Sequence, residues 1–228
     1  MPGNTSTGSH GFYQLSTLLI LAVSRILVIT DHRKPCTPYE RYFSSSWRLL
    51  SFLPCDLVNK KENLSLEHDF SLIKINNEYQ IRIPNYMKKT EELHDEASLQ
   101  FQNVFKETYL IIIDEPKDEF ISVFNMLGEY DSTLSVVENY RNIQLRFISE
   151  NITSPEISEP TARKINGLDA ELVELDGRVE GVIYKVSYFL AFFEGDENVY
   201  MAMAWTISTR KDRFQDTFEK AFGTFQLI

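Results

Sequence analysis

Side chains that could carry out chemistry are few and scattered in this chain. Its histidines and cysteines are His10, His32, His68, His94, Cys36 and Cys55. The four histidines stand far from one another and there is no CxxC pair, so the sequence predicts no metal site and no cofactor. A disulfide between the two cysteines stays open, because spacing alone does not decide it.

Two acidic runs, residues 91–96 and 114–119, are the other groups with chemical potential. A carboxylate pair for acid–base catalysis needs at least one member in a dry pocket, whereas these runs are polar throughout. They also lack the Asp-x-Asp-x-Asp-Gly order of a calcium loop, so we expect solvated loops. Glycine-rich phosphate loops and the GxSxG motif are missing, and the sequence predicts a protein that is not an enzyme.

A stretch of alternating aromatic residues, 180–207, reads as two strands joined by the turn EGDEN. Tyr184, Tyr188 and Phe192 are expected on one face of the first strand, and Trp205 belongs to the second. Core packing is the default reason for such alternation. Because buried Tyr and Trp need polar partners, a groove between sheet and helix is the alternative, and these four residues are our candidate ligand-binding residues.

The charge of the chain is unevenly distributed. The net charge is −10, yet residues 1–61 hold seven Lys/Arg against three Asp/Glu, and residues 62–228 hold sixteen against thirty. An acidic body repels phosphate backbones, so we expect no nucleic-acid partner. Basic residues beside an apolar run in the first part would suit an anionic membrane surface.

The leader, defined as residues 1–61, contains the most hydrophobic run of the chain, residues 15–29, with Arg25 inside it. This run is shorter than the roughly 20 residues of a comfortable membrane span, although 15–23 has the length of a signal-peptide core. Three interpretations stay open: a degenerate signal or anchor, a helical or disordered appendage, and a mis-assigned start that adds non-native residues.

A second apolar run, residues 47–55, ends in a cysteine, which makes Cys55 a candidate for lipidation. The match to a lipobox is poor, because Pro54 stands where a small residue is expected. The polar segment that follows predicts a domain boundary near residue 62. Residues 62–228 are then one domain, long enough for a well-buried core.

The body alternates between the periodicities of strands and helices. The apolar residues of 72–75 precede a turn at Asn76 and Asn77, and we expect strands at residues 79–83, 99–105, 109–113, 167–177, 182–193 and 199–208. One amphipathic helix is expected to start at Ser132 or Thr133 and to run to about residue 147. A second carries phenylalanines four residues apart and ends at Gly223.

The segments 114–119 and 149–167 are expected to be loops, the second because Pro155 and Pro160 interrupt it. The sheet has partly apolar faces on both sides, and each helix has one apolar stripe. The economical arrangement is an antiparallel sheet sandwiched by helices, an α+β fold.

Four motifs follow one another in the body: YQIRIP, INGLDAELVELDG, VIYKVSYFLAFFEGDENVYMAMAW and FQDTFEKAFGTFQ. Their order and spacing resemble the PsbP-like family over residues 72–228, although the closing helix has Gly223 and Thr224 before Phe225 where the family usually has a Ser-Phe pair. The resemblance implies an antiparallel sheet between helices. It also implies an accessory role, because the family shares no catalytic residues.

Plant members of that family are extrinsic subunits of the oxygen-evolving photosystem, and a eukaryotic branch binds the nuclear-transport GTPase Ran. Bacterial relatives are often exported or lipid-anchored. By this resemblance we expect a non-enzymatic protein that binds another protein and is exported or membrane-tethered through residues 15–29.

Two alternatives stay open, a cytosolic protein-binding module of the same fold and a small-molecule or lipid carrier that uses the aromatic sheet face. The first differs only in compartment. The carrier predicts a concave apolar pocket near Tyr188 and Trp205.

Overall fold

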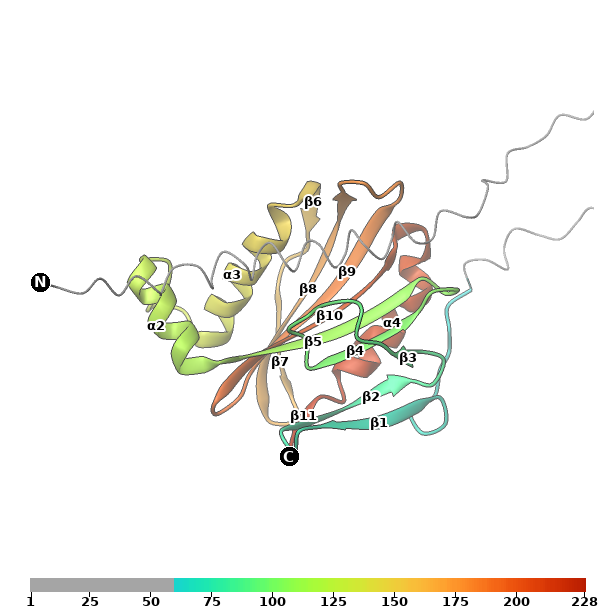
Figure 1. Cartoon of the computed structure of the whole chain (residues 1–228), viewed down its shortest axis with the longest axis horizontal. Coiled ribbons are helices and arrows are strands. Elements are labelled where there is room, and N and C mark those ends of the chain that lie inside the picture. Colours follow the sequence, from blue (N-terminus) through green and yellow to red (C-terminus); the bar gives the residue numbers. More distant parts are fainter. Residues whose placement is uncertain (1–59) are drawn as a thin grey trace, which may run out of the picture.

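The computed structural model describes residues 60–228, which form a large antiparallel sheet with a small sheet packed against it (Figure 1). In the large sheet the strand order is β3 (Lys88–Lys89), β4 (Leu99–Asn103), β5 (Thr108–Pro116), β10 (Asn198–Ile207), β9 (Lys185–Glu194), β8 (Leu168–Val179) and β6 (Ile152–Ile157). The eighth strand, β7 (Thr161–Ile165), pairs with the first part of β8.

The small sheet joins the two ends of the described chain. The hairpin of β1 (Phe70–Ile75) and β2 (Tyr79–Pro84) turns at Asn76 and Asn77, whose positive φ angles asparagine tolerates better than most residues. The final strand, β11 (Gln226–Leu227), pairs with β2. The C-terminus is therefore fixed beside the first hairpin.

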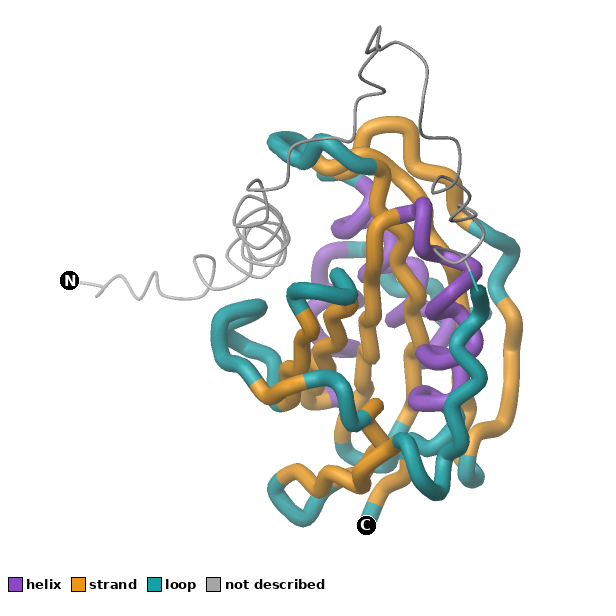
Figure 2. Tube along the Cα trace, turned by 90° about the vertical axis from the view of Figure 1, so that its right-hand side faces the viewer, coloured by secondary structure: helices purple, strands orange, loops and turns teal. Residues whose placement is uncertain are grey.

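Helices cover both faces of the large sheet, as Figure 2 shows by the adjoining layers of strands and helices. On one face α2 (Lys117–Leu127) and α3 (Val136–Ser149) enclose the first core cluster. On the other face, α4 (Lys211–Phe222), entered through the short helix η2 (Ser208–Arg210), and the small sheet enclose the second. The predicted α+β sandwich is confirmed.

The alternation along β10 explains why the two faces hold different layers. Met201, Met203 and Trp205 point into the first core, whereas Ala202 and Ala204 face the second. Small side chains on that face leave room for a helix at close range. The helix α4 fills this room with Phe214, Phe218 and Phe222, all almost completely buried.

The helix α3 begins three residues later than the earliest expected start. Ser135, rather than Ser132 or Thr133, is the N-cap, and it forms a capping box with Glu138. Asp131 instead accepts hydrogen bonds from the amide and hydroxyl of Thr133, at 2.8 and 2.7 Å, and closes a separate turn. The prediction of the N-cap was wrong because two capping-type residues precede the real one.

Two segments expected to be loops contain regular structure. The run 114–119 contains the end of β5 and the start of α2, which buries Phe120 and Phe124 and ends at Gly128 with φ of 72°. The run 149–167 contains β6 and β7, with Pro155 at an irregularity of the β6–β8 register. Both strands pair on one side only, where proline is tolerated.

Two predicted strands are too long at one end. β9 begins at Lys185, so Tyr184 lies in the preceding turn with a side chain 49% exposed. β4 ends at Asn103, so Phe105 lies at the tip of the β4–β5 turn and is 81% exposed. Both apolar side chains point away from the core that the alternation predicted for them.

The leader predictions lie outside the described residues. This holds for residues 15–29 and for Cys36, Cys55, His10 and His32, and the boundary at residue 62 stays a prediction. Glu62 already belongs to the body, because its carboxylate contacts Lys106 and, at 3.2 Å, Arg213. Within residues 60–228, no helix has the length and apolar character needed to cross a bilayer.

Candidate functional site

The predicted aromatic site is part of the first core. Trp205 stacks on Tyr109 with 5.2 Å between ring centroids and lies 6.4 Å from Tyr188. Phe192 meets the edge of Tyr140, on α3, at 6.0 Å. Tyr188, Phe192 and Trp205 are at most 2% exposed, so these rings fill the interface between sheet and helix instead of lining an opening. Tyr184 is on a different surface.

Two buried polar atoms of this cluster have no hydrogen-bond partner among the described residues: Trp205 Nε1 and the Tyr109 hydroxyl. Burial also raises the pKa of Tyr109 to about 12. An unpaired buried donor costs about 1–3 kcal/mol. Burying an aromatic side chain of 150–250 Å² gains roughly 4–6 kcal/mol, so packing outweighs the lost hydrogen bonds.

Glu115, at the end of β5, lies beneath α3. Its Oε1 accepts hydrogen bonds from the Tyr140 hydroxyl and from Gln144 Nε2, both at 2.8 Å. Burial raises the pKa of Glu115, and the hydrogen bond from Tyr140 opposes that rise. A carboxyl group with a raised pKa can act as an acid, but both of these partners belong to α3. The arrangement therefore fastens the helix to the sheet.

Asp114 projects to the opposite face of β5, close to Glu78. Burial raises the pKa of Asp114, a hydrogen bond with Ser98 lowers it, and the charge of Glu78 raises it further. Glu78 accepts hydrogen bonds from Tyr200, at 2.8 Å, and from Asn198. These contacts connect the small sheet to β10 and again serve the fold.

The acidic run 91–96 is less solvated than predicted. His94 is 4% exposed, and its backbone is held by the side chain of Gln100, whose Oε1 accepts from the amides of Leu93 and His94 at 2.9 and 3.0 Å. Burial lowers the pKa of His94. In the part of the chain that the structure describes, no three His, Cys, Asp or Glu side chains are grouped to hold a metal ion.

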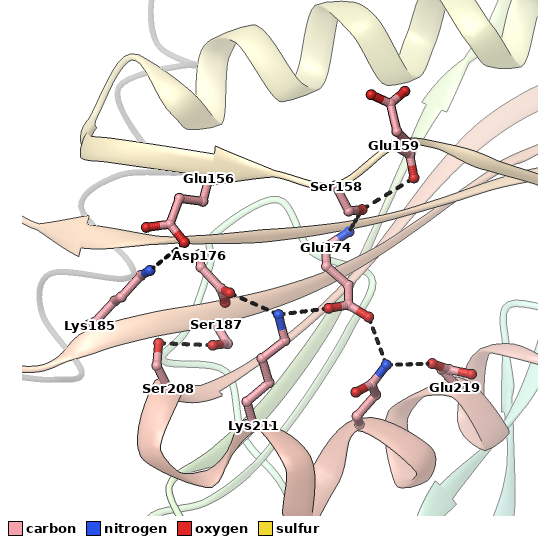
Figure 3. Close-up of polar contacts among 11 residues, drawn as sticks. Glu156, Ser158, Glu159, Glu174, Asp176, Lys185, Ser187, Ser208, Lys211 and Glu219 are labelled. Carbon is pink, nitrogen blue, oxygen red and sulfur yellow. Dashed lines mark hydrogen bonds and ion pairs between the residues drawn. The ribbon is translucent and has the colours of Figure 1, made fainter.

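A polar cluster connects α4 to β8 (Figure 3). Lys211 Nζ lies 2.7 Å from Glu174 and 2.8 Å from Asp176, and Gln215 donates to both Glu174 and Glu219. Burial alone would lower the pKa of Lys211, but the hydrogen bonds to the two carboxylates raise it. A lysine held in its charged form is an ion-pair partner and a poor nucleophile or base.

A cavity of about 80 Å³ opens beside this cluster, between β7, β8 and α4. Arg163, Glu174 and Glu219 supply its charged lining, and Leu172 and Phe222 part of its apolar lining. Small-molecule sites usually enclose roughly 300–1,000 Å³. This cavity has room for a few water molecules, and it lies on the face opposite Tyr188 and Trp205.

No family model matches the sequence, and no curated protein matches it. Among solved structures, the chain is similar to cyanobacterial PsbP (CyanoP) from Synechocystis sp. PCC 6803, with a TM-score of 0.50 and 11% identity over 75% of this chain and 99% of that one. The chain has the PsbP-like fold. The resemblance expected from the order of the four motifs is thereby confirmed at the level of the fold.

Two further similarities are too weak to carry an argument. LpqN, involved in cell envelope biogenesis of Mycobacterium tuberculosis, has a TM-score of 0.40 and 8% identity, over 65% of this chain and 82% of that one. PA94 of Pseudomonas aeruginosa, a protein of unknown function, has a TM-score of 0.41 and 14% identity, over 68% and 94% of the two chains.

The sequence did contain a signal for the missed helix α2. Asp118 and Glu119 favour the first turn of a helix, Phe120 and Phe124 lie one turn apart, and Gly128 follows at the C-terminal end. The pairing of Glu115 with α3 had no such signal, because its two partners lie more than 20 residues further along the chain.

Proposed function

We propose that this PsbP-like protein is a non-enzymatic accessory protein that binds another protein and is exported or tethered to a membrane by its leader. The observation that carries the proposal is the use of its reactive side chains. Glu115 and Lys211 are engaged by neighbours that hold a helix to the sheet, and the Nδ1 of buried His94 accepts a hydrogen bond from the Glu96 amide within its own loop. A rigid body of this kind offers its outer surface as its functional part.

The fold supports the same proposal by analogy. The PsbP-like resemblance implies accessory and adaptor roles, and an analogy of fold supports a class of function and not a particular partner. The small-molecule carrier loses support, because Tyr188, Phe192 and Trp205 are packed against each other and against α3. The cytosolic module differs from our proposal only in the fate of the leader.

Intact mass and membrane partitioning of the full-length chain, expressed in a bacterial host, test this proposal. A shortened chain, or a chain recovered with the membranes, supports export or tethering. Cys55→Ser distinguishes the routes, because it removes a lipid mass from a lipidated chain and changes nothing in a chain held by residues 15–29. A full-mass chain found only in the soluble fraction would refute the proposal of export or tethering.

A further inference from the structure

Two apolar turns lie at the same end of the large sheet. The β4–β5 turn exposes Val104 by 38% and Phe105 by 81%, and the β8–β9 turn exposes Ile183 by 67% and Tyr184 by 49%. We call these four residues the tip surface. Only β10 lies between the β4–β5 and β8–β9 hairpins, so the midpoints of the two turns are separated by about three strand spacings, roughly 15 Å. In Figure 1 the β8–β9 turn lies at the top of the body and the β4–β5 turn at its right-hand side.

The leader joins the body at this same end. Lys61 contacts Asp216 of α4 at 3.3 Å, and the Glu62 amide donates to the Arg213 carbonyl at 3.2 Å. The Glu62 carboxylate contacts Lys106, the residue next to Phe105. Whatever residues 15–29 and Cys55 bind is therefore connected to the tip end of the body.

Charge also distinguishes the two ends of the sheet. Near the tip surface, basic and acidic side chains are balanced in ion pairs, such as Arg210 with Glu107 at 3.2 Å and Lys185 with Glu156 at 2.8 Å. At the opposite end, where β5 meets α2 and β9 turns into β10, there are six carboxylates, those of Glu78, Asp114, Glu115, Glu194, Asp196 and Glu197. Of these, Glu115 is buried beneath α3, and Glu194 pairs with Lys117 at 3.5 Å. An anionic surface therefore repels the tip end least.

We propose that the tip surface rests on a lipid bilayer and inserts Phe105 and Ile183 into its interfacial region. The inference rests on the proposed function in one respect, since the leader must first bring the body to the membrane. The run 15–29, which is only 15 residues long and contains Arg25, is a weak anchor. Stable attachment usually requires a second contact, and aromatic side chains at the headgroup level supply one.

This contact fixes the orientation of the protein. With the tip surface on the membrane, the acidic end points away from the lipid. A second protein bound at the acidic end would lie about one strand length away from the bilayer. Because that end is acidic, a basic surface on the second protein is favoured.

Flotation of the full chain with vesicles of phosphatidylcholine and phosphatidylglycerol tests the inference. Phe105→Asp is expected to weaken vesicle binding by at least about fivefold, because it replaces an inserted phenyl ring with a charge. Met126→Asp is the matched control, since Met126 is also 81% exposed but lies on α2, at the other end of the sheet. Both residues are exposed, so neither variant should unfold.

A depth measurement reads the same contact without weakening it. The native chain already contains Trp47 and Trp205, so quenching is measured relative to it. The emission added by Phe105→Trp is expected to be quenched by brominated lipids, and the emission added by Met126→Trp is not. If the native chain floats and the two variants of each pair behave alike, the tip surface does not touch lipid and the inference fails, while tethering by the leader stands. If the native chain does not float at all, both the tip contact and the membrane tether are refuted.

Discussion

Truncating Phe218 should destabilise this protein far more than truncating an exposed phenylalanine. Phe218, on the face of α4 that packs on the sheet, is fully buried. Its ring centroid lies 5.3 Å from that of Phe189 and 6.3 Å from that of Phe214. A buried phenylalanine removes about 150–250 Å² from water, worth roughly 4–6 kcal/mol. Alanine keeps a small part of this, so we expect Phe218→Ala to cost about 3–5 kcal/mol.

The facing residues make relaxation difficult. Ala191, Ala202 and Ala204 belong to the same core cluster, and their methyl groups cannot move far enough to fill the space of a lost ring. The cavity should therefore persist, which puts the cost in the upper part of that range.

Urea denaturation and thermal unfolding of the full chain measure this difference. Phe218→Ala should lower the melting temperature by about 10 °C or more. Phe105→Ala is the matched control, because the same substitution at a side chain 81% exposed should change the free energy of unfolding by less than about 0.5 kcal/mol. Equal effects of the two substitutions, or a cost below about 1.5 kcal/mol at Phe218, would refute the close packing of α4 on the alanine face.

Three further substitutions test local features. A Cβ on Gly177 would stand 1.9 Å from Ile152 Cγ2, so Gly177→Ala should lower the free energy of unfolding in urea by about 1–3 kcal/mol. Adding Ile152→Ala should restore part of this loss, whereas additive costs of the two substitutions would contradict the clash. Ser135→Ala should lower the free energy of unfolding by about 1 kcal/mol, because it removes the capping box. An equal effect of Ser132→Ala would instead support Ser132 as the N-cap. Because the pKa of Glu115 is raised, its contribution to stability is complete below the ordinary glutamate pKa of about 4.5 and is lost as pH rises through the folded-state pKa. Glu115→Gln should therefore flatten the decline of the unfolding free energy with pH. An unchanged pH profile would show that the carboxyl is not buried.

Local patterns were sufficient where one sheet face or one helix stripe decided the structure. The alternation from Val199 to Ile207 is the alternation of β10 between its two cores, and the phenylalanines of α4 with Gly223 behind them mark a helix that the structure contains. These residues report a period that is independent of distant neighbours. The order of such elements was enough to indicate the PsbP-like fold.

The ends of elements depended on contacts that no local pattern contains. Tyr184 continues the period of β9 and yet lies in a turn, because the β8–β9 ladder ends at the pair of Arg178 and Lys185. Pro155 interrupts any helix, but it is accommodated in β6 because this strand pairs on one side only. Pairing with a neighbouring strand settled each case.

The sequence by itself determined the composition of the two cores, the acidic body and the apolar leader, because these depend only on which residues are present and at what period. Tertiary structure decided what the candidate residues do. It placed Trp205 and Phe192 inside, where burial of large rings outweighs unpaired polar atoms. It left Phe105 and Tyr184 outside, in two separate turns at one end of the sheet. Strand pairing decides which apolar side chains stay exposed, and this pairing is set only when the complete sheet forms.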